Sequence, residues 1–70
     1  MYPPQKPQQL YLYTKYGVRY PVIIVREEPD EYEYGITSEE VLVETYPKTG
    51  IKYYYGWVKR SDLVRVGIVD

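Results

Sequence analysis

Short apolar segments with a repeat of two residues are the feature that most constrains how this chain can fold. Within residues 10–16, Leu10 and Leu12 share one face, and Tyr11 and Tyr13 share the other. Such a repeat is typical of a β-strand. Further segments of this kind, bounded by Gly, Pro or polar residues, predict strands at 19–27, 40–46, 51–59 and 64–66.

The composition favours the same fold class. The large apolar residues are Val, Ile, Leu, one Trp and eleven Tyr, and the chain has neither Phe nor Ala. β-Branched and aromatic side chains suit pleated, half-buried surfaces. A chain of 70 residues forms one domain, and without Cys no disulfide reinforces its core. We therefore predict an all-β fold, a small five-stranded barrel, because closure removes exposed strand edges.

Local signals predict how the strands bend and end. The run Val22–Val25 predicts a strand that is buried on both faces or strongly curved, and Pro21 is expected near the start of that strand or at an edge. Gly56 is expected to mark a bulge or kink. Residues 60–63 predict a single 3₁₀ turn before the last strand, capped by Ser61 or Asp62, and Gly67 is expected to end the chain's last strand.

The two ends of the chain differ in character. Residues 1–9 are rich in Pro and Gln and predict a flexible tail, whereas residues 10–70 form the predicted domain. The tail contains the Pro4-x-x-Pro7 spacing of proline-rich ligands. No apolar run is long enough to span a membrane and no signal peptide is recognisable, so the default expectation is a cytoplasmic protein. Absence of Asn and Cys, with many Glu, Lys and Arg, is a trend of thermophilic proteins.

Charge is segregated along the sequence. Residues 1–26 carry four basic and no acidic side chains, residues 27–46 carry eight acidic and no basic ones, and residues 47–70 carry five basic and two acidic ones. The segment 28–38 predicts a long acidic loop, with room for a short strand at 32–34. We expect the acidic surface of this loop to comprise Glu27, Glu28, Asp30, Glu31 and Glu33. The alternative is a solvated loop balanced by the basic strands beside it.

The residues that most often carry enzyme chemistry are missing. The chain has no His and no Cys, which removes the commonest general base, the thiolate nucleophiles and most transition-metal sites. The two Ser residues have no evident base partner, and neither a Gly-rich phosphate loop nor calcium-loop spacing occurs. We therefore predict a protein that is not an enzyme, without cofactor or metal.

Two segments carry a family resemblance. The stretch Tyr55–Leu63 resembles the G-W-V-x-x-S-x-L ending of SH3-like barrels, in which a short 3₁₀ turn separates the last two strands. Lys15–Val22 is similar to the segment that names PWWP domains, with Tyr20-Pro21 in place of Trp-Pro. Both lie within residues 10–66, and together they imply an SH3-like barrel of the Tudor and PWWP group.

In that group, aromatic side chains form a cage that binds methylated lysine through cation–π attraction. The resemblance implies Tyr20 and Tyr46 as two walls of such a cage. Gly17 stands at another usual wall and offers no side chain, and Val18 and Arg19 replace the first half of the naming motif.

The surplus of tyrosine is the strongest pointer to function. Eleven phenol rings exceed what so small a core can bury, and exposed Tyr is enriched at interfaces. We predict a patch of Tyr11, Tyr13 and Tyr54 on strand faces opposite the core, with Tyr32 and Tyr34 on the acidic loop. The alternative is that Tyr replaces Phe as a core residue. The full set of predicted partner-binding residues is Tyr11, Tyr13, Tyr20, Tyr32, Tyr34, Tyr46, Tyr54 and Trp57.

Three functions remain open at this point. The favoured one is a module that binds a protein or peptide, either basic or proline-rich, and the chain's own tail docking on a neighbour would give a homo-oligomer. The second is a nucleic-acid-binding barrel, which the acidic block and the pI near 5.4 disfavour. Its surface would combine Tyr with Lys52, Lys59, Arg60 and Arg65. The third is a structural or assembly part of a virus or mobile element.

Overall fold

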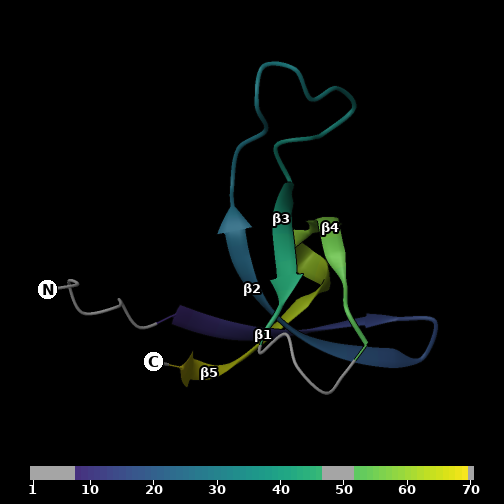
Figure 1. The fold of residues 1–70 in the computed structure, drawn as a ribbon, viewed down its shortest axis with the longest axis vertical. Coiled ribbons are helices and arrows are strands. Elements are labelled where there is room, and N and C mark those ends of the chain that lie inside the picture. The colour runs from purple at the N-terminus through teal and green to yellow at the C-terminus, as the bar shows by residue number, and fades with distance from the viewer. Residues whose placement is uncertain (1–7, 47–51, 70) are drawn as a thin grey trace, which may run out of the picture.

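The fold is all-β, as predicted. The computed structural model describes residues 8–46 and 52–69, and within them five antiparallel strands form one sheet in the order β4-β3-β2-β1-β5 (Figure 1). The 3₁₀ turn η1, Arg60–Asp62, lies between the last two strands. The strands are β1 (Gln8–Lys15), β2 (Val18–Arg26), β3 (Glu40–Thr45), β4 (Tyr55–Lys59) and β5 (Leu63–Val69).

The predicted strands are confirmed with shifted ends. The first begins at Gln8, inside the predicted tail, because its first two residues pair with Val69 and Ile68 of β5. The last strand runs through Gly67 instead of ending there. The predicted 3₁₀ turn forms, but its N-cap is Lys59 and no side chain caps it. Residues 1–7 and the turn predicted at 47–50 lie outside the described residues.

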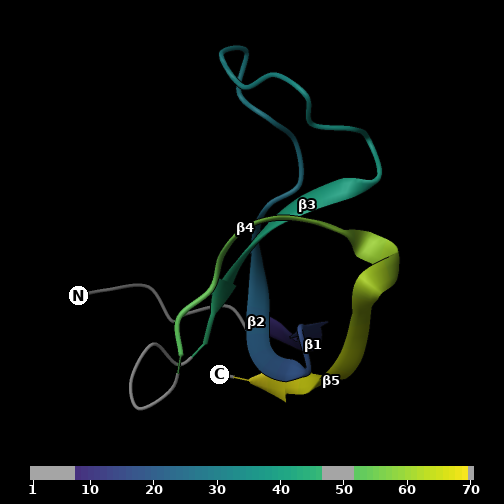
Figure 2. The same cartoon turned by 90° about the vertical axis from the view of Figure 1, so that its right-hand side faces the viewer.

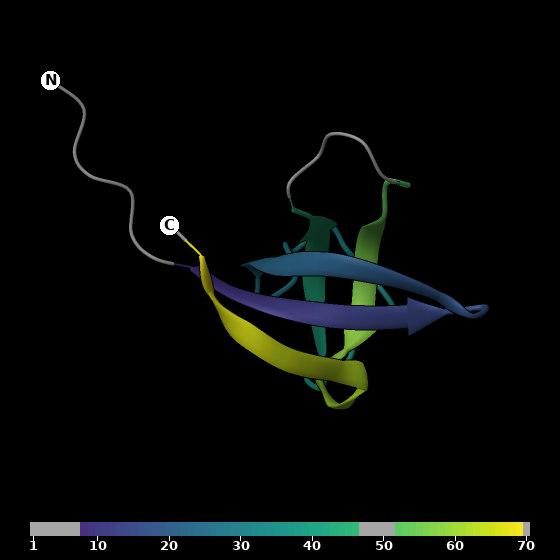
Figure 3. The same cartoon turned by 90° about the horizontal axis from the view of Figure 1, so that it is seen from below.

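The sheet curls but is not closed into a barrel, so the predicted closure is not met. β4 pairs with β3 and β5 pairs with β1, and within the described residues β4 and β5 do not pair with each other. Figure 2 shows η1 carrying the chain from β4, one outer strand of the curled sheet, to β5, the opposite outer strand. Figure 3 shows β1 lying between β2 and β5. A three-residue 3₁₀ turn leads β5 away from β4, whereas a tight hairpin would have paired them.

The first hairpin closes with two residues in the left-handed conformation. Lys15 pairs with Val18, and the intervening Tyr16 and Gly17 have φ values of 51° and 76°. Positive φ at both central residues is the geometry of a type I′ turn, whose twist matches that of the strands. The predicted strand break at Gly17 is therefore this turn, and it leaves the Tyr16 ring in solvent.

The central strand β2 is curved. Its register with β3 shifts between Ile24 and Arg26, which leaves Val25 as the extra residue of a bulge. A bulge bends a strand and increases its twist. Val22 is fully buried, whereas Val25 is 42% exposed. Of the two predictions for the run Val22–Val25, the strongly curved strand is therefore confirmed, and the strand buried on both faces is not.

Pro21 is the fourth residue of this central strand rather than its start or an edge. The Pro21 carbonyl accepts a hydrogen bond of 2.8 Å from the Tyr46 N–H. Val22 and Thr45 form the last registered pair of β2 and β3 at this end. Proline is tolerated here because the N–H that it lacks would point toward β3 just beyond the last registered pair of β2 and β3, so no hydrogen bond within that pairing is lost.

The core consists of four buried valines with tyrosine rings packed on them. The valines come from β2, β3 and β4 and are Val22, Val41, Val43 and Val58. The partly buried residues that pack against them are Tyr11, Tyr13, Tyr20, Ile24, Tyr54 and Leu63.

The expected orientation of β1 is therefore wrong. Tyr11 and Tyr13 face the core, while Leu10 and Leu12 lie half-buried on the other face. A repeat of two shows which residues share a face but not which face is inside. Four valines fill a small volume, and in a chain without Phe the phenol rings complete it.

We predict that Val43→Ala lowers the free energy of unfolding by roughly 2 kcal/mol, because it removes buried methyl groups and leaves a cavity. Val43 is 0% exposed, whereas Val64 on the edge strand is 64% exposed. The matched change Val64→Ala should therefore cost less than about 0.5 kcal/mol. Urea unfolding measures both, and equal losses would contradict this assignment of the core.

Candidate functional site

Four of the predicted partner-binding tyrosines lie inside the fold. Tyr11, Tyr13, Tyr20 and Tyr54 are all partly buried against the valine core. The ring of Tyr54 is central, since its centroid lies 5.0 Å from that of Tyr13 and 5.4 Å from that of Tyr20, with tilted planes. Such tilted aromatic pairs add to the stability gained from burial. The patch predicted from Tyr11, Tyr13 and Tyr54 is thus part of the core, as the alternative interpretation held.

Tyr54 is fixed by the buried Thr45. The Thr45 N–H and hydroxyl donate to the Tyr54 carbonyl at 3.0 and 2.9 Å, and the Tyr54 N–H donates to the Thr45 hydroxyl at 2.5 Å. These bonds satisfy the only buried polar residue of the described core, which is 1% exposed. The Tyr54 ring lies beside Gly56, which pairs with Val43 in an unbroken register, so the bulge predicted at Gly56 is absent.

The tyrosine cluster perturbs one hydroxyl. Burial raises the pKa of Tyr13 above its ordinary value, and its hydrogen bond to Tyr54 raises this pKa further, while the nearby Lys15 ammonium opposes the shift. The Lys15 ammonium also lies 5.4 Å from the Tyr54 ring centroid and 5.5 Å from that of Tyr16. The cluster therefore favours neutral Tyr13.

Of the two walls implied for a methyl-lysine cage, Tyr20 forms a tilted ring contact with Tyr54 and packs against the core. Tyr46 is half-buried just after β3. The ring faces of this cluster are thus used largely within the fold.

The acidic loop, residues 27–39, is attached to the sheet through Glu33. The Glu33 carboxylate accepts hydrogen bonds from the Trp57 indole N–H at 3.0 Å, from the Asp30 N–H at 2.9 Å, and from the Arg26 guanidinium, with which it forms an ion pair. The Glu33 N–H donates to the Asp30 carbonyl at 3.0 Å, which makes a turn where a short strand was predicted.

Trp57, one of the predicted partner-binding residues, makes several contacts within the fold. The Arg26 guanidinium carbon lies 5.6 Å from the centre of the Trp57 ring, a cation–π contact. Trp57 pairs with Leu42 across β3 and β4, and Leu42 is only 5% exposed although it lies on the face opposite the valine core. Arg26, Leu42 and Trp57, none of them adjacent in sequence, thus form a second small cluster that Glu33 closes.

Both ends of the acidic loop are attached as well. Glu27 forms an exposed ion pair with Arg60 of η1. At the other end, the Thr37 N–H and hydroxyl donate to the Glu40 carboxylate at 2.9 and 3.1 Å, and the Glu40 N–H donates to the Thr37 carbonyl at 3.1 Å. The loop is therefore held at its start, middle and end.

The middle of the loop exposes charge and rings. Tyr32 is 77% exposed and Tyr34 is 86% exposed. Glu28, Asp30 and Glu31 are also exposed, and none forms an ion pair with a described residue. We call these five residues the loop tip.

The basic residues predicted for nucleic-acid binding are distributed over several elements. Lys52 precedes β4, Lys59 ends it opposite Glu40, and Arg65 lies on β5 opposite Tyr11. Arg60 is paired with Glu27. The nucleic-acid alternative remains a prediction that no contact of these residues supports.

Comparison with known proteins gives no assignment: no family model, curated protein or solved structure matches this chain. Among the described residues, no cluster of acidic side chains is arranged to hold a metal ion. None of the helical structure in this part of the chain is long and apolar enough to cross a membrane.

We predict that the fold loses stability at alkaline pH through Tyr13. Tyrosine in the unfolded chain ionises near pH 10, and the raised pKa of Tyr13 delays its ionisation in the fold. Its contribution is therefore complete below about pH 10 and is lost as the pH rises through the folded-state value. Urea midpoints from about pH 9 to about pH 11 should fall less steeply for Tyr13→Phe than for the wild type. Tyr16→Phe, at an exposed ring, is the control, and identical slopes for all three proteins would refute the prediction.

We also predict that Glu33→Ala releases the acidic loop. Trp57, the chain's single tryptophan, loses its acceptor, so its fluorescence should shift to the red and amide exchange over residues 28–36 should quicken. Stability should fall by less than about 1 kcal/mol because the ion pair is partly exposed. Glu31→Ala removes one carboxylate without these bonds. If it has the same effect, Glu33 does not hold the loop.

Proposed function

We propose that this chain is a non-enzymatic binding module that holds a basic segment of a partner protein on its loop tip. We further propose that its fold is an open variant of the SH3-like arrangement. The strand order and the 3₁₀ turn before the last strand support this fold. The segment resembling the G-W-V-x-x-S-x-L ending falls on β4, η1 and the start of β5, which also supports it.

The observation that carries the function is the contrast between the attached loop and its exposed tip. Glu27 and Glu33 form ion pairs with Arg60 and Arg26, whereas Glu28, Asp30 and Glu31 form none with a described residue. Unpaired carboxylates attract a basic partner and speed its association. Because the loop is already ordered by its attachments, binding forfeits less conformational entropy than it would on a free loop.

Tyr32 and Tyr34 supply contact area on the same segment. Their rings carry little rotamer entropy and offer both an apolar face and a hydroxyl. Lysine and arginine side chains also stack on phenol rings through cation–π attraction. The combination of rings with carboxylates favours a basic segment over a proline-rich one, since the predicted patch of Tyr11, Tyr13 and Tyr54 is packed on the core.

We predict that a short lysine-rich peptide binds the wild type at low salt and that Glu28→Gln with Glu31→Gln weakens its affinity about tenfold, the effect of losing roughly 1.4 kcal/mol of attraction. Glu39→Gln with Asp62→Asn removes the same charge from exposed positions outside the loop tip. This control should lose less than about twofold. Fluorescence anisotropy measures the three affinities. Equal weakening in both variants would show that net charge, not the loop tip, attracts the peptide.

A further inference from the structure

Strands β1 and β2 pair along part of their length and then separate, which leaves a gap between them. Pairing of β1 with β2 runs from Lys15 and Val18 to Tyr11 and Val22 and stops there. Within the described residues, Gln8–Leu10 then pairs only with β5, and β2 beyond Val22 pairs only with β3. Figure 1 shows the two strands diverging, as β2 turns toward β3 and β1 continues beside β5. In this part of the sheet, β1 and β2 therefore each have one side that no described strand covers.

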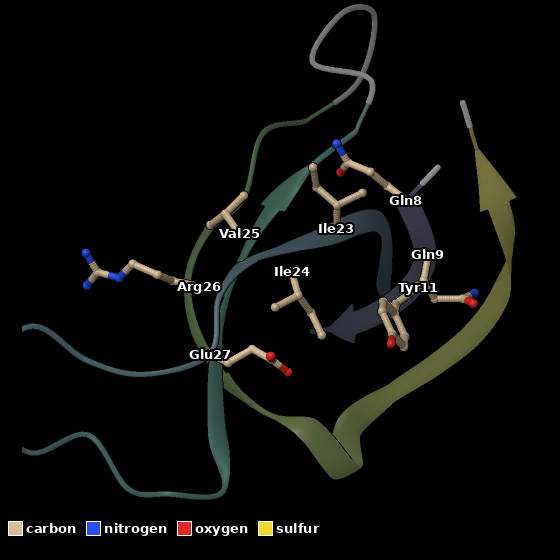
Figure 4. Close-up of a pocket in the computed structure, with 8 residues that line it drawn as sticks. All are labelled: Gln8, Gln9, Tyr11, Ile23, Ile24, Val25, Arg26 and Glu27. Carbon is tan, nitrogen blue, oxygen red and sulfur yellow. The ribbon is translucent and has the colours of Figure 1, made fainter. Parts of the chain in front are cut away.

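An open hollow of about 610 Å³ lies at the gap, and its volume is within the range of ligand-binding pockets. Its walls include Ile23 and Ile24, consecutive residues that point to opposite faces of β2. Side chains from both faces of β2 therefore line this hollow, which places it along the edge of the strand. Figure 4 shows Ile24 and Glu27 extending from the β2 side toward Tyr11 of β1.

Backbone groups face this hollow. The Pro21 carbonyl points to β3, where it accepts the Tyr46 N–H, so the backbone of Val22 points to β1. Alternation then directs the N–H and carbonyl of Ile24 into the gap, where no described strand pairs with them. Such groups bond to water or to an added strand.

The hollow leads to the acidic loop. A second hollow, of about 560 Å³, shares Glu27 and is also lined by Glu28 and Pro29. Its other walls are Ile36, Thr37 and Ser38, from the far end of the loop. An apolar floor at Ile24 and Tyr11 therefore continues into carboxylates, one of which, Glu28, forms no ion pair with a described residue.

We propose that an extended segment of the partner enters this gap as an added strand. Its backbone pairs with β2 at Ile24, an apolar side chain packs on Ile24 and Tyr11, and a following basic side chain reaches Glu28, beside the Glu27–Arg60 ion pair. Charge complementarity and continuity with the loop tip identify the occupant as a polypeptide with alternating apolar residues before a basic end. The inference rests on the proposed function and specifies the form in which the basic segment binds.

The test uses a synthetic peptide that alternates threonine and valine and ends in two lysines. A second copy is methylated at alternate backbone nitrogens, so that it keeps the side chains and the charge but loses donors on one edge. A third copy is methylated on the opposite edge, and a fourth copy is methylated on both edges. Strand pairing predicts at least about tenfold weaker binding for one single-edge copy and for the doubly methylated copy, because two or more hydrogen bonds are lost. Amide exchange at Ile24 should slow in the complex with the unmodified peptide.

The outcomes separate this inference from the proposed function. If all copies bind alike and Glu28→Gln with Glu31→Gln weakens them all, the loop tip binds the basic end and the added strand is wrong. If methylation weakens binding but the double variant does not, the added strand is right and the role of the loop tip is wrong. Slower exchange at Arg65, whose backbone faces the open edge of β5, without protection of Ile24 would place the peptide on the sheet edge and overturn the inference. No binding of the unmodified peptide would overturn both.

Discussion

The fold depends on tyrosine rings that complete a core of four valines. Valine side chains are short, and a core made of them alone would leave the two halves of the curled sheet poorly filled. Tyr54 supplies the missing volume. It lies just before β4, at one end of the sheet, and its ring contacts Tyr13 of β1 and Tyr20 of β2. Its backbone is in turn held by Thr45. A polar ring can serve here because its hydroxyl has a hydrogen-bond partner in Tyr13.

The curvature that creates this core also opens the gap. β2 contributes to both halves of the sheet, pairing with β1 at its start and with β3 at its end. The bulge at Val25 adds twist to the second half, so β2 leaves β1 after Val22. With β5 carried to the outer side of β1 by η1, none of the five described strands covers the edge of β2 at Ile24. An open sheet and a free strand edge thus share one cause.

The sequence was sufficient to predict where the strands lie, but not which face of each strand packs on the core. Alternation at residues 10–16 predicted a strand, and Gly17 predicted its end, because both are local properties. Whether Leu12 or Tyr13 faces the core depends on what lies opposite, and Tyr54 is far away in sequence. The turn at 60–63 was recognisable for the same local reason, whereas the open sheet depends on how β4 and β5 are oriented. Properties set by neighbours in the chain were predictable, and those set by packing partners were not.

The candidate site shows the same limit in its charges. The acidic segment was predicted as one negative surface, yet Glu33 and Glu27 are used within the fold by Arg26 and Arg60. Opposite charge in the flanking segments made such pairs plausible, but only the structure shows which carboxylates they use. The pairing divides the loop into attached residues and an exposed tip. It also brings Glu27 to the mouth of the gap beside β2, so the acidic loop and the free strand edge form one continuous surface. A partner attracted by the charge of the tip would therefore meet unpaired backbone within a few residues, which couples the electrostatic and the strand-pairing contributions to binding.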